Sequence, residues 1–221
     1  MTFTDALEKA LREHSNKENA VPMEHYMKNN FPFLGIKAEK RRAICKTVWL
    51  KHKTEVQQNF RTIVWKLFQL KEREFHQCGI DILVKESKNR FVLEDVDFIE
   101  QLILTNSWWD SVDVLAKYVF GGYLEQFPNA TISCIEKFSN SEALWLNRSA
   151  LLFQLNYKSK TNFELLRSEC EKHKLSNEFF IQKAIGWALR EYSKYNPSAV
   201  LEYVNGTNLK PLSKREAIRN I

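Results

Sequence analysis

The sequence predicts an all-α protein, built as a curved superhelix of paired helices with a basic concave groove. Segments of about 10 to 18 residues place apolar side chains at the period of an α-helix, and none alternates apolar and polar residues. The chain has only six glycines and five prolines, and most of them fall between these segments. A weak internal repeat completes the argument for a stack of similar units.

The repeat is visible in three segments of similar pattern: Phe75–Leu83, Leu146–Leu155 and Phe180–Leu189. Aligning Gln77, Arg148 and Gln182 gives separations of 71 and 34 residues, which are two periods and one. The missing middle unit falls near residue 112. A period of about 35 residues with paired helices indicates an αα solenoid of the HEAT or TPR kind, with about six helix pairs. Equivalent helices of such a stack lie side by side on its concave surface.

Length and charge limit the class of protein. A chain of 221 residues is long enough for one well-packed domain, and we expect a single HEAT-like domain over residues 1–221. A formal charge of +6 and a pI of about 9.0 favour nucleic acid or another anionic surface as partner. The first 14 residues lack the apolar core of a signal peptide, and no apolar run is long enough to span a membrane. We therefore expect a cytoplasmic protein without a membrane partner.

The cysteines and histidines suggest no metal. Four cysteines lie far apart without a CxxC pair, and we expect reduced, buried thiols. The five histidines form no HExxH or comparable motif, so neither a structural nor a catalytic metal is expected.

Turn residues predict where the helices end. The apolar stretch Phe31–Ile36 is short and interrupted by Pro32, which predicts a buried turn. The remaining predicted boundaries involve Gly35, Gly121 and Gly122 with Pro128, Pro197, Gly206, and Pro211. The last residue, Ile221, is expected to lie within a helix.

The most informative helix begins near Ser107. Ser107 with Asp110 three residues later has the pattern of a capping box. Trp109 and Asp113 are then four residues apart on one helical face. The apolar stripe beside them consists of Val112, Leu115, Ala116 and Val119. A large aromatic face beside a carboxylate, in a basic protein, suits a cation or a group that becomes cationic during a reaction.

Arg148 is unusual because it lies within an apolar stripe. Ser139–Glu142 predicts a capping box, with a helix that continues to about Leu155 and buries Leu144, Leu151, Leu152 and Leu155. A guanidinium in that stripe must extend to solvent, pair with an acid, or line a cleft. Asp113, which lies between two valines, is the complementary acid. A buried pair that only fixes helix packing and a catalytic pair are both compatible with this pattern.

A third helix, predicted from Asn177 to about Tyr195 with Ser176 as its cap, has two distinct faces. Its apolar face consists of Ile181, Ile185, Ala188 and Tyr192. Its opposite face is a basic stripe, defined as Lys183, Trp187, Arg190 and Lys194. Cations around an aromatic ring suit a phosphate backbone with a sugar or base. A solvated face with one stray tryptophan is the alternative.

These residues fit cleavage of an N-glycosidic bond in DNA. The chain has no glycine-rich phosphate loop, GxSxG elbow or kinase motif. A carboxylate can stabilise a sugar oxocarbenium ion or activate water, and tryptophan rings favour the developing positive charge. No residue is placed to protonate a leaving base. The leaving group should therefore already be cationic, as an alkylated purine is.

The chain resembles the DNA alkylation repair glycosylases of the AlkD type, which are HEAT-like repeat proteins that excise N3- and N7-alkylated purines. The resemblance extends over nearly the whole chain. It is most specific in Ser107–Asp113 and in Phe179–Tyr192. The other similar stretches are His25–Phe31 with Gly35, Ile36, Arg41 and Arg42; Arg73–Phe75 with Asp81 and Ile82; Trp145, Leu146 and Arg148–Ala150; and Pro211–Ala217.

The resemblance implies roles for individual residues. Asp113 would be the catalytic carboxylate, Trp109 and Trp187 the aromatic faces on the sugar of the lesion, and Arg148 the arginine that supports the site and a nearby phosphate. The implied nucleic-acid contacts are Tyr26, Lys37, Arg41, Lys183, Arg190, Lys194, Lys214 and Arg215. One departure is Asn156, at a position where close family members carry a groove lysine, and this change could weaken DNA affinity.

The resemblance also implies a monomer that acts on duplex DNA containing alkylated bases, without base flipping, metal, cofactor or obligate protein partner. Two other functions remain open. One is a non-enzymatic protein that binds DNA structures. The other is a HEAT-type protein-interaction scaffold in which the tryptophans anchor a partner. The complete set of Trp109, Asp113, Arg148 and Trp187 favours the enzyme.

Overall fold

The computed structural model describes residues 1–221 and contains helices and turns but no strand, which confirms the all-α prediction. The chain divides into two compact units, Met1–Arg90 and Phe91–Ile221. The expectation of one domain over residues 1–221 stays a prediction.

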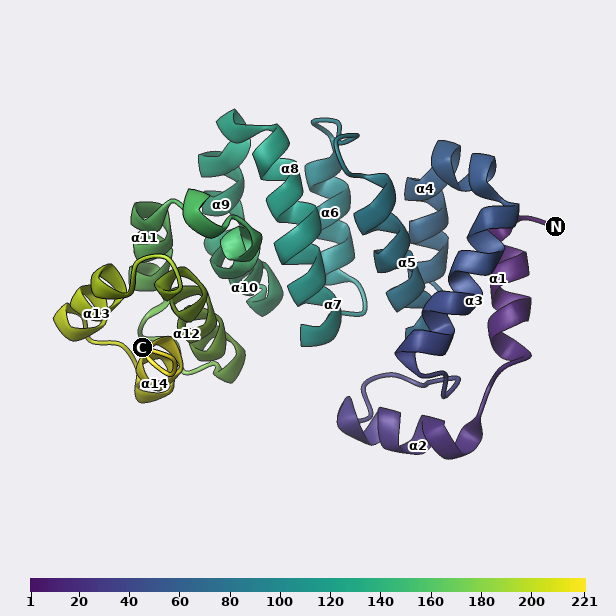
Figure 1. Cartoon of the computed structure of the whole chain (residues 1–221), viewed down its shortest axis with the longest axis horizontal. Coiled ribbons are helices and arrows are strands. Elements are labelled where there is room, and N and C mark those ends of the chain that lie inside the picture. The colour runs from purple at the N-terminus through teal and green to yellow at the C-terminus, as the bar shows by residue number, and fades with distance from the viewer. The chain divides into compact units, whose positions relative to one another are not determined.

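Unit 1 contains five helices, coloured purple to blue in Figure 1. They are α1 (Phe3–Arg12), α2 (Lys17–Tyr26), α3 (Ala38–Lys51), α4 (Lys53–Phe68) and α5 (Arg73–Glu86). Helix α4 packs mainly against α5, and α1 packs against both α3 and α4. Helix α1 begins with a true capping box, in which Thr2 and Asp5 bond to each other's backbone.

The buried turn predicted at Phe31–Ile36 is confirmed, and its apolar side chains are in the core of unit 1. Its backbone N–H groups have no helical partner. Those of Leu34, Gly35 and Ile36 donate instead to the buried carboxylate of Glu74, over 3.0, 2.9 and 3.0 Å. Gly35 has φ +81°, a backbone conformation that favours glycine. One carboxylate thus satisfies three donors that would otherwise be buried unpaired.

Unit 2 contains the helices coloured teal to yellow in Figure 1. They are α6 (Asp95–Leu104), α7 (Trp109–Val114), α8 (Gly121–Gln126), α9 (Thr131–Ser139), α10 (Leu144–Leu152), α11 (Phe163–His173), α12 (Phe179–Ser193), α13 (Pro197–Gly206) and α14 (Pro211–Ala217). Short 3₁₀ turns at Pro128–Ala130, Phe153–Asn156 and Lys158–Lys160 connect some of them. Helix α10 packs against α7 on one side and α12 on the other. The helices that carry Asp113, Arg148 and Trp187 are therefore neighbours, as the repeat predicted.

The helix boundary predicted at Gly121 and Gly122 is wrong. A π-helix, Leu115–Phe120, joins α7 directly to α8, so the backbone stays helical from Trp109 to Gln126. Gly121 is needed there for close packing, because an added Cβ atom would lie 2.4 Å from the carbonyl oxygen of Phe153. The boundaries predicted at Pro197, Gly206 and Pro211 are confirmed by the ends of α13 and the start of α14.

The three predicted serine caps are wrong as well. Helix α7 has Trp108 at its N-cap, and the Ser107 hydroxyl donates to the carbonyl of Ile103 in the preceding helix. Helices α10 and α12 begin later than predicted, after Ala143 and Glu178, and neither has a side-chain cap. In both cases the nearby serine accepts a backbone N–H just ahead of the helix. The final helix ends at Ala217, so Ile221 is not within a helix.

All four cysteines are free and buried, as predicted. No helix combines the length and the apolar character that a membrane crossing requires.

Candidate active site

Asp113 and Arg148 form a two-pronged ion pair between α7 and α10. Arg148 Nε donates to Asp113 Oδ1 over 2.7 Å, and Arg148 Nη2 donates to Oδ2 over 2.9 Å. The arginine side chain is only 5% exposed, whereas 15% of the aspartate side chain remains exposed. The acid predicted for Arg148 is therefore present, and its carboxylate is fixed in orientation while still reaching the surface.

Two opposing effects act on the Asp113 carboxyl. Burial raises its pKa above the ordinary value of 3.8, while the hydrogen bonds and charge of Arg148 oppose this rise. Asp110, three residues earlier on α7, raises the pKa further through charge repulsion. The group has the character of a desolvated carboxylate whose negative charge depends on Arg148.

A third contact ties this ion pair to α12. Arg148 Nη1 donates to the carbonyl oxygen of Phe180, which lies in the first turn of α12. The Phe180 ring packs against Trp108 and Trp145, with ring centroids 5.3 and 5.0 Å apart. In this aromatic cluster (Trp108, Trp145 and Phe180), the Phe180 ring centroid lies 5.8 Å from the guanidinium carbon of Arg148. Arg148 therefore connects the three helices.

Trp109 and Trp187 lie on helices of this same set. Trp109 is one turn before Asp113 on α7, and Trp187 lies in the middle of α12. Both side chains are half-buried. Trp187 packs against the core of unit 2, so part of its ring is a packing surface.

The basic stripe is less free than its sequence suggested. Lys183 Nζ and Arg190 Nη1 both pair with the carboxylate of Glu216 on α14, at 3.0 and 2.8 Å. Lys194 pairs with Glu191, one turn earlier on α12, at 2.8 Å. The prediction that all three cations are available to phosphates overlooked these two carboxylates. Glu216 is distant in sequence, and Glu191 lies one turn before Lys194 on the same helix. The DNA contacts themselves stay a prediction.

Lys214 and Arg215 lie on α14 and are exposed. Unlike the predicted DNA contacts on α12, these two side chains form no ion pair with an acid of the protein. Their neighbour Glu216 pairs with Lys183 and Arg190 of α12 instead. Asn156 is also exposed, at the end of the 3₁₀ turn after α10.

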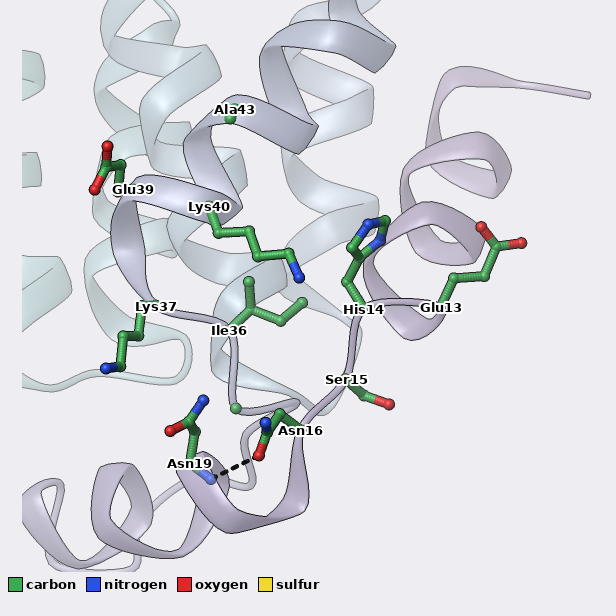
Figure 2. A pocket seen from close by; sticks show the side chains of 11 residues that line it. Glu13, His14, Ser15, Asn16, Asn19, Ile36, Lys37, Glu39, Lys40 and Ala43 are labelled. Atoms are coloured by element: carbon green, nitrogen blue, oxygen red, sulfur yellow. Dashed lines mark hydrogen bonds between the residues drawn. The ribbon is translucent and has the colours of Figure 1, made fainter.

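The three predicted contacts of unit 1 have different surroundings. Tyr26 is 67% exposed at the end of α2. Lys37 lines an open cavity of about 680 Å³ between α1, α2 and α3, where Figure 2 shows Lys40 reaching toward His14. Arg41 is only 3% exposed, and its Nη1 donates to Asp81 over 2.8 Å. This burial favours a structural role for Arg41, while the adjacent Arg42 is exposed.

Sequence reasoning missed two groups that shape the site. The aromatic cluster was missed because rings far apart in sequence can be brought together only by the fold, although Trp145 and Phe180 lie in stretches already noted. Glu216 was missed because it is a single acid within a basic segment. No group of three or more His, Cys, Asp or Glu side chains could hold a metal ion.

Comparisons with known proteins identify the family of the chain. A sequence model of the family described as DNA alkylation repair enzyme matches residues 7–221. The chain belongs to the DNA alkylation repair enzyme family. The family resemblance expected from the Trp109–Asp113 and Phe179–Tyr192 stretches is thus confirmed.

Two solved structures are similar to this chain, and the more similar one supports its membership of the DNA alkylation repair enzyme family. One, described as a predicted DNA alkylation repair enzyme from Enterococcus faecalis, is 36% identical, with a TM-score of 0.86 over 94% of this chain and 96% of that chain. A second, the crystal structure of smu.31 from Streptococcus mutans UA159, is 17% identical, with a TM-score of 0.59 over 83% of this chain and 98% of that chain. The second shares the fold alone. No curated protein matches the chain.

Proposed function

We propose that the protein is a monofunctional DNA glycosylase that hydrolyses the N-glycosidic bond of cationic N3- or N7-alkylated purines in duplex DNA. One observation carries this proposal. The Asp113 carboxylate is held by a buried arginine, still reaches the surface, and lies one turn from Trp109. An ion pair that served only helix packing would not require the Asp113 side chain to be partly exposed. Family membership makes damaged DNA the expected substrate.

The proposed reaction begins with a base that already carries positive charge. Its bond to the sugar breaks with the electron pair moving to the base, which leaves as a neutral purine. The sugar becomes an oxocarbenium ion, which the Asp113 carboxylate stabilises electrostatically. The faces of Trp109 and Trp187 favour the same charge. Water then adds to the sugar carbon and gives up a proton, for which Asp113 is the proposed acceptor, and an abasic site remains.

One feature supports hydrolysis by water over attack by a lysine. Lys183, the lysine one turn from Trp187, is paired with the Glu216 carboxylate at 3.0 Å and is therefore restrained. An amine held by a carboxylate on another helix is not free to attack the sugar. We also propose that the base is not flipped into a pocket, and that the stacked helices form a curved superhelix with a basic groove for the duplex. The protein would act as a cytoplasmic monomer without a cofactor.

The decisive experiment is release of free base from alkylated duplex DNA. Duplex treated with a methylating agent is incubated with the protein, and the released purines are separated by chromatography. The proposal expects free N3- and N7-methylpurines at a rate above spontaneous loss, and abasic DNA with unbroken strands. Borohydride should trap no covalent protein–DNA adduct. Trapping at Lys183 would contradict attack by water.

One observation favours the alternative of a DNA-structure-binding protein without catalysis. Both carboxylate oxygens of Asp113 already accept hydrogen bonds from Arg148. Such a protein would bind duplex or branched DNA with strong salt dependence but release no base. A protein-interaction scaffold would show neither property.

A further inference from the structure

Glu216 occupies an unusual position because one carboxylate joins two cations of the basic stripe. Its Oε1 lies 3.0 Å from Lys183 Nζ, and its Oε2 lies 2.8 Å from Arg190 Nη1. Arg190 also donates to the backbone carbonyl of Glu216. The side chain of Glu216 is only 8% exposed, whereas those of Lys183 and Arg190 are 36% and 21% exposed. The acid is covered while its two partners still reach the surface.

The chain is built to hold the acid there. Gly186 lies between Lys183 and Arg190 on the same face of α12. A Cβ atom at Gly186 would lie 2.4 Å from Glu216 Cβ and 3.0 Å from the carbonyl oxygen of Ser213. The Ser213 hydroxyl donates to the carbonyl of Gln182, which fixes α14 on α12 a second time. Glycine at this position therefore lets α14 bring Glu216 between the two cations.

The charge of Glu216 is secure. The hydrogen bonds from Arg190 and Lys183 lower its pKa to about 2, so the carboxylate is ionised at any pH at which the protein is used. The cluster of Lys183, Arg190 and Glu216 has a net charge of +1 instead of +2. A phosphate that approaches either cation must compete with a carboxylate that is already bonded to it.

We propose that Glu216 is a specificity-determining residue, which positions Lys183 and Arg190 beside Trp187 and weakens their hold on undamaged DNA. The inference rests on the proposed function for its catalytic part only. Held in place, the two cations accept a phosphate in one register relative to Trp187. Without Glu216, the two cations would bind phosphates with greater affinity but in many registers. Most of those registers would not place the damaged nucleotide beside Trp187. Glu216 touches neither sugar nor base in this proposal, and it acts through its partners.

Glu216→Gln tests the proposal because it keeps the shape and removes the charge. We expect tighter binding to undamaged duplex, and a salt dependence steeper by about 0.9 in the log–log slope for each additional phosphate neutralised. Single-turnover excision, measured with all substrate bound, should slow by about tenfold or more. A residue that only stabilises the fold would lower affinity and rate together.

Two further variants make the result specific. Glu202→Gln on α13 removes an exposed carboxylate and changes the net charge equally, and it should alter neither property by more than about twofold. Glu216→Asp keeps the charge but shortens its reach, so affinity should rise less than in Glu216→Gln while excision still slows. If Glu216→Gln does not fold, this aspartate variant decides, and wild-type excision in it would overturn the proposal.

The binding measurements and the excision measurements test the two proposals independently. If the wild-type protein releases no base, the proposed function is wrong, and the affinity and salt slope of Glu216→Gln still test the role of Glu216. If Glu216→Gln and Glu202→Gln tighten binding equally, the effect belongs to net charge and the proposal is wrong.

Discussion

Asp113 and Arg148 show how a single pair of residues can serve both packing and chemistry. The guanidinium bonds to α7 through Asp113 and to α12 through the carbonyl of Phe180. The pair was predictable from sequence because an arginine in an apolar stripe requires an acid, and Asp113 was the buried acid available. The third bond was not predictable, because a backbone carbonyl has no sequence pattern.

Removing the charge of Asp113 should abolish most of the catalysis and little else. Asp113→Asn preserves the shape of the side chain, so we expect a folded protein with near-normal affinity for duplex. Excision should slow by about 100-fold or more, a typical loss for one preorganised electrostatic group. Glu125→Gln on α8 is the control, since it removes an exposed carboxylate that does not act on Asp113. Full excision by Asp113→Asn would exclude Asp113 from the reaction.

The pH dependence of excision should report the ionisation of Asp113. Only the carboxylate form stabilises positive charge, so the rate should fall as pH falls through the pKa of this group. Burial raises that pKa above 3.8, which moves the acid limb of the profile upward by the same amount. Single-turnover rates corrected for spontaneous depurination give the profile. Asp113→Asn should remove the limb, and a limb that survives in that variant belongs to another group.

Arg148 should matter more for stability than Asp113 does. Arg148→Met leaves Asp113 as an unpaired carboxylate that is largely buried, and we expect the free energy of unfolding to drop by about 3 kcal/mol. Adding Asp113→Leu removes the stranded charge, so much of that loss should be recovered in urea unfolding, without recovery of excision. A double variant no more stable than Arg148→Met would show that lost packing is the cause.

At the level of helices, periodicity predicted more than capping did. Most apolar side chains around Asp113, Arg148 and Trp187 are buried where the 3.6-residue period placed them, while Leu144 and Tyr192 are half-buried. The serine caps failed because a cap depends on the local backbone conformation, and Ser107, Ser139 and Ser176 bond elsewhere. Glycine positions were ambiguous for a similar reason. A glycine can mark the end of a helix or a close contact within one, and the choice depends on a distant partner such as Phe153.

Gly121 and Gly122 offer a test of that distinction. Gly121→Ala would place a Cβ atom 2.4 Å from the carbonyl oxygen of Phe153, and the required shift should cost about 1–3 kcal/mol. Gly122→Ala meets only the edge of Phe91 at 3.4 Å, and helix propensity should offset most of the cost. Thermal unfolding of the two variants gives the comparison. Equal effects would mean that α8 does not need its close contact.

Across the whole chain, the sequence predicted class and family well and charge distribution less well. The excess of +6 pointed to an anionic partner, but individual cations of unit 2 are neutralised by acids that fold next to them. Lys214 and Arg215 remain exposed, so we expect them to carry more of the salt-dependent affinity. Charge counts cannot make this distinction, because pairing is set by tertiary contacts.

Replacing both Lys214 and Arg215 with alanine should weaken binding to damaged and undamaged duplex equally. If each cation neutralises one phosphate, the log–log salt slope should become shallower by about 1.8. Fluorescence anisotropy across a salt series measures both quantities. Lys172→Ala at the end of α11 with Lys174→Ala just after it removes the same charge elsewhere. A slope changed equally by both pairs would mean that no local contact is involved.

The π-helix between α7 and α8 has a consequence for how related chains correspond to this one. A π turn holds one residue more than the α-helical turn it replaces. Within an α-helix, an extra residue would rotate everything beyond it by about 100°. The π-helix Leu115–Phe120 accommodates that residue instead. The helical segment with Asp113 and the segment that begins at Gly121 therefore keep the same sides toward the core. One residue can therefore be gained or lost here without rotating the helix before or after the π-helix. A related chain with an unbroken α-helix here should therefore align with a one-residue gap between Asp113 and Gly121, and an ungapped alignment would match the wrong residue to one of them.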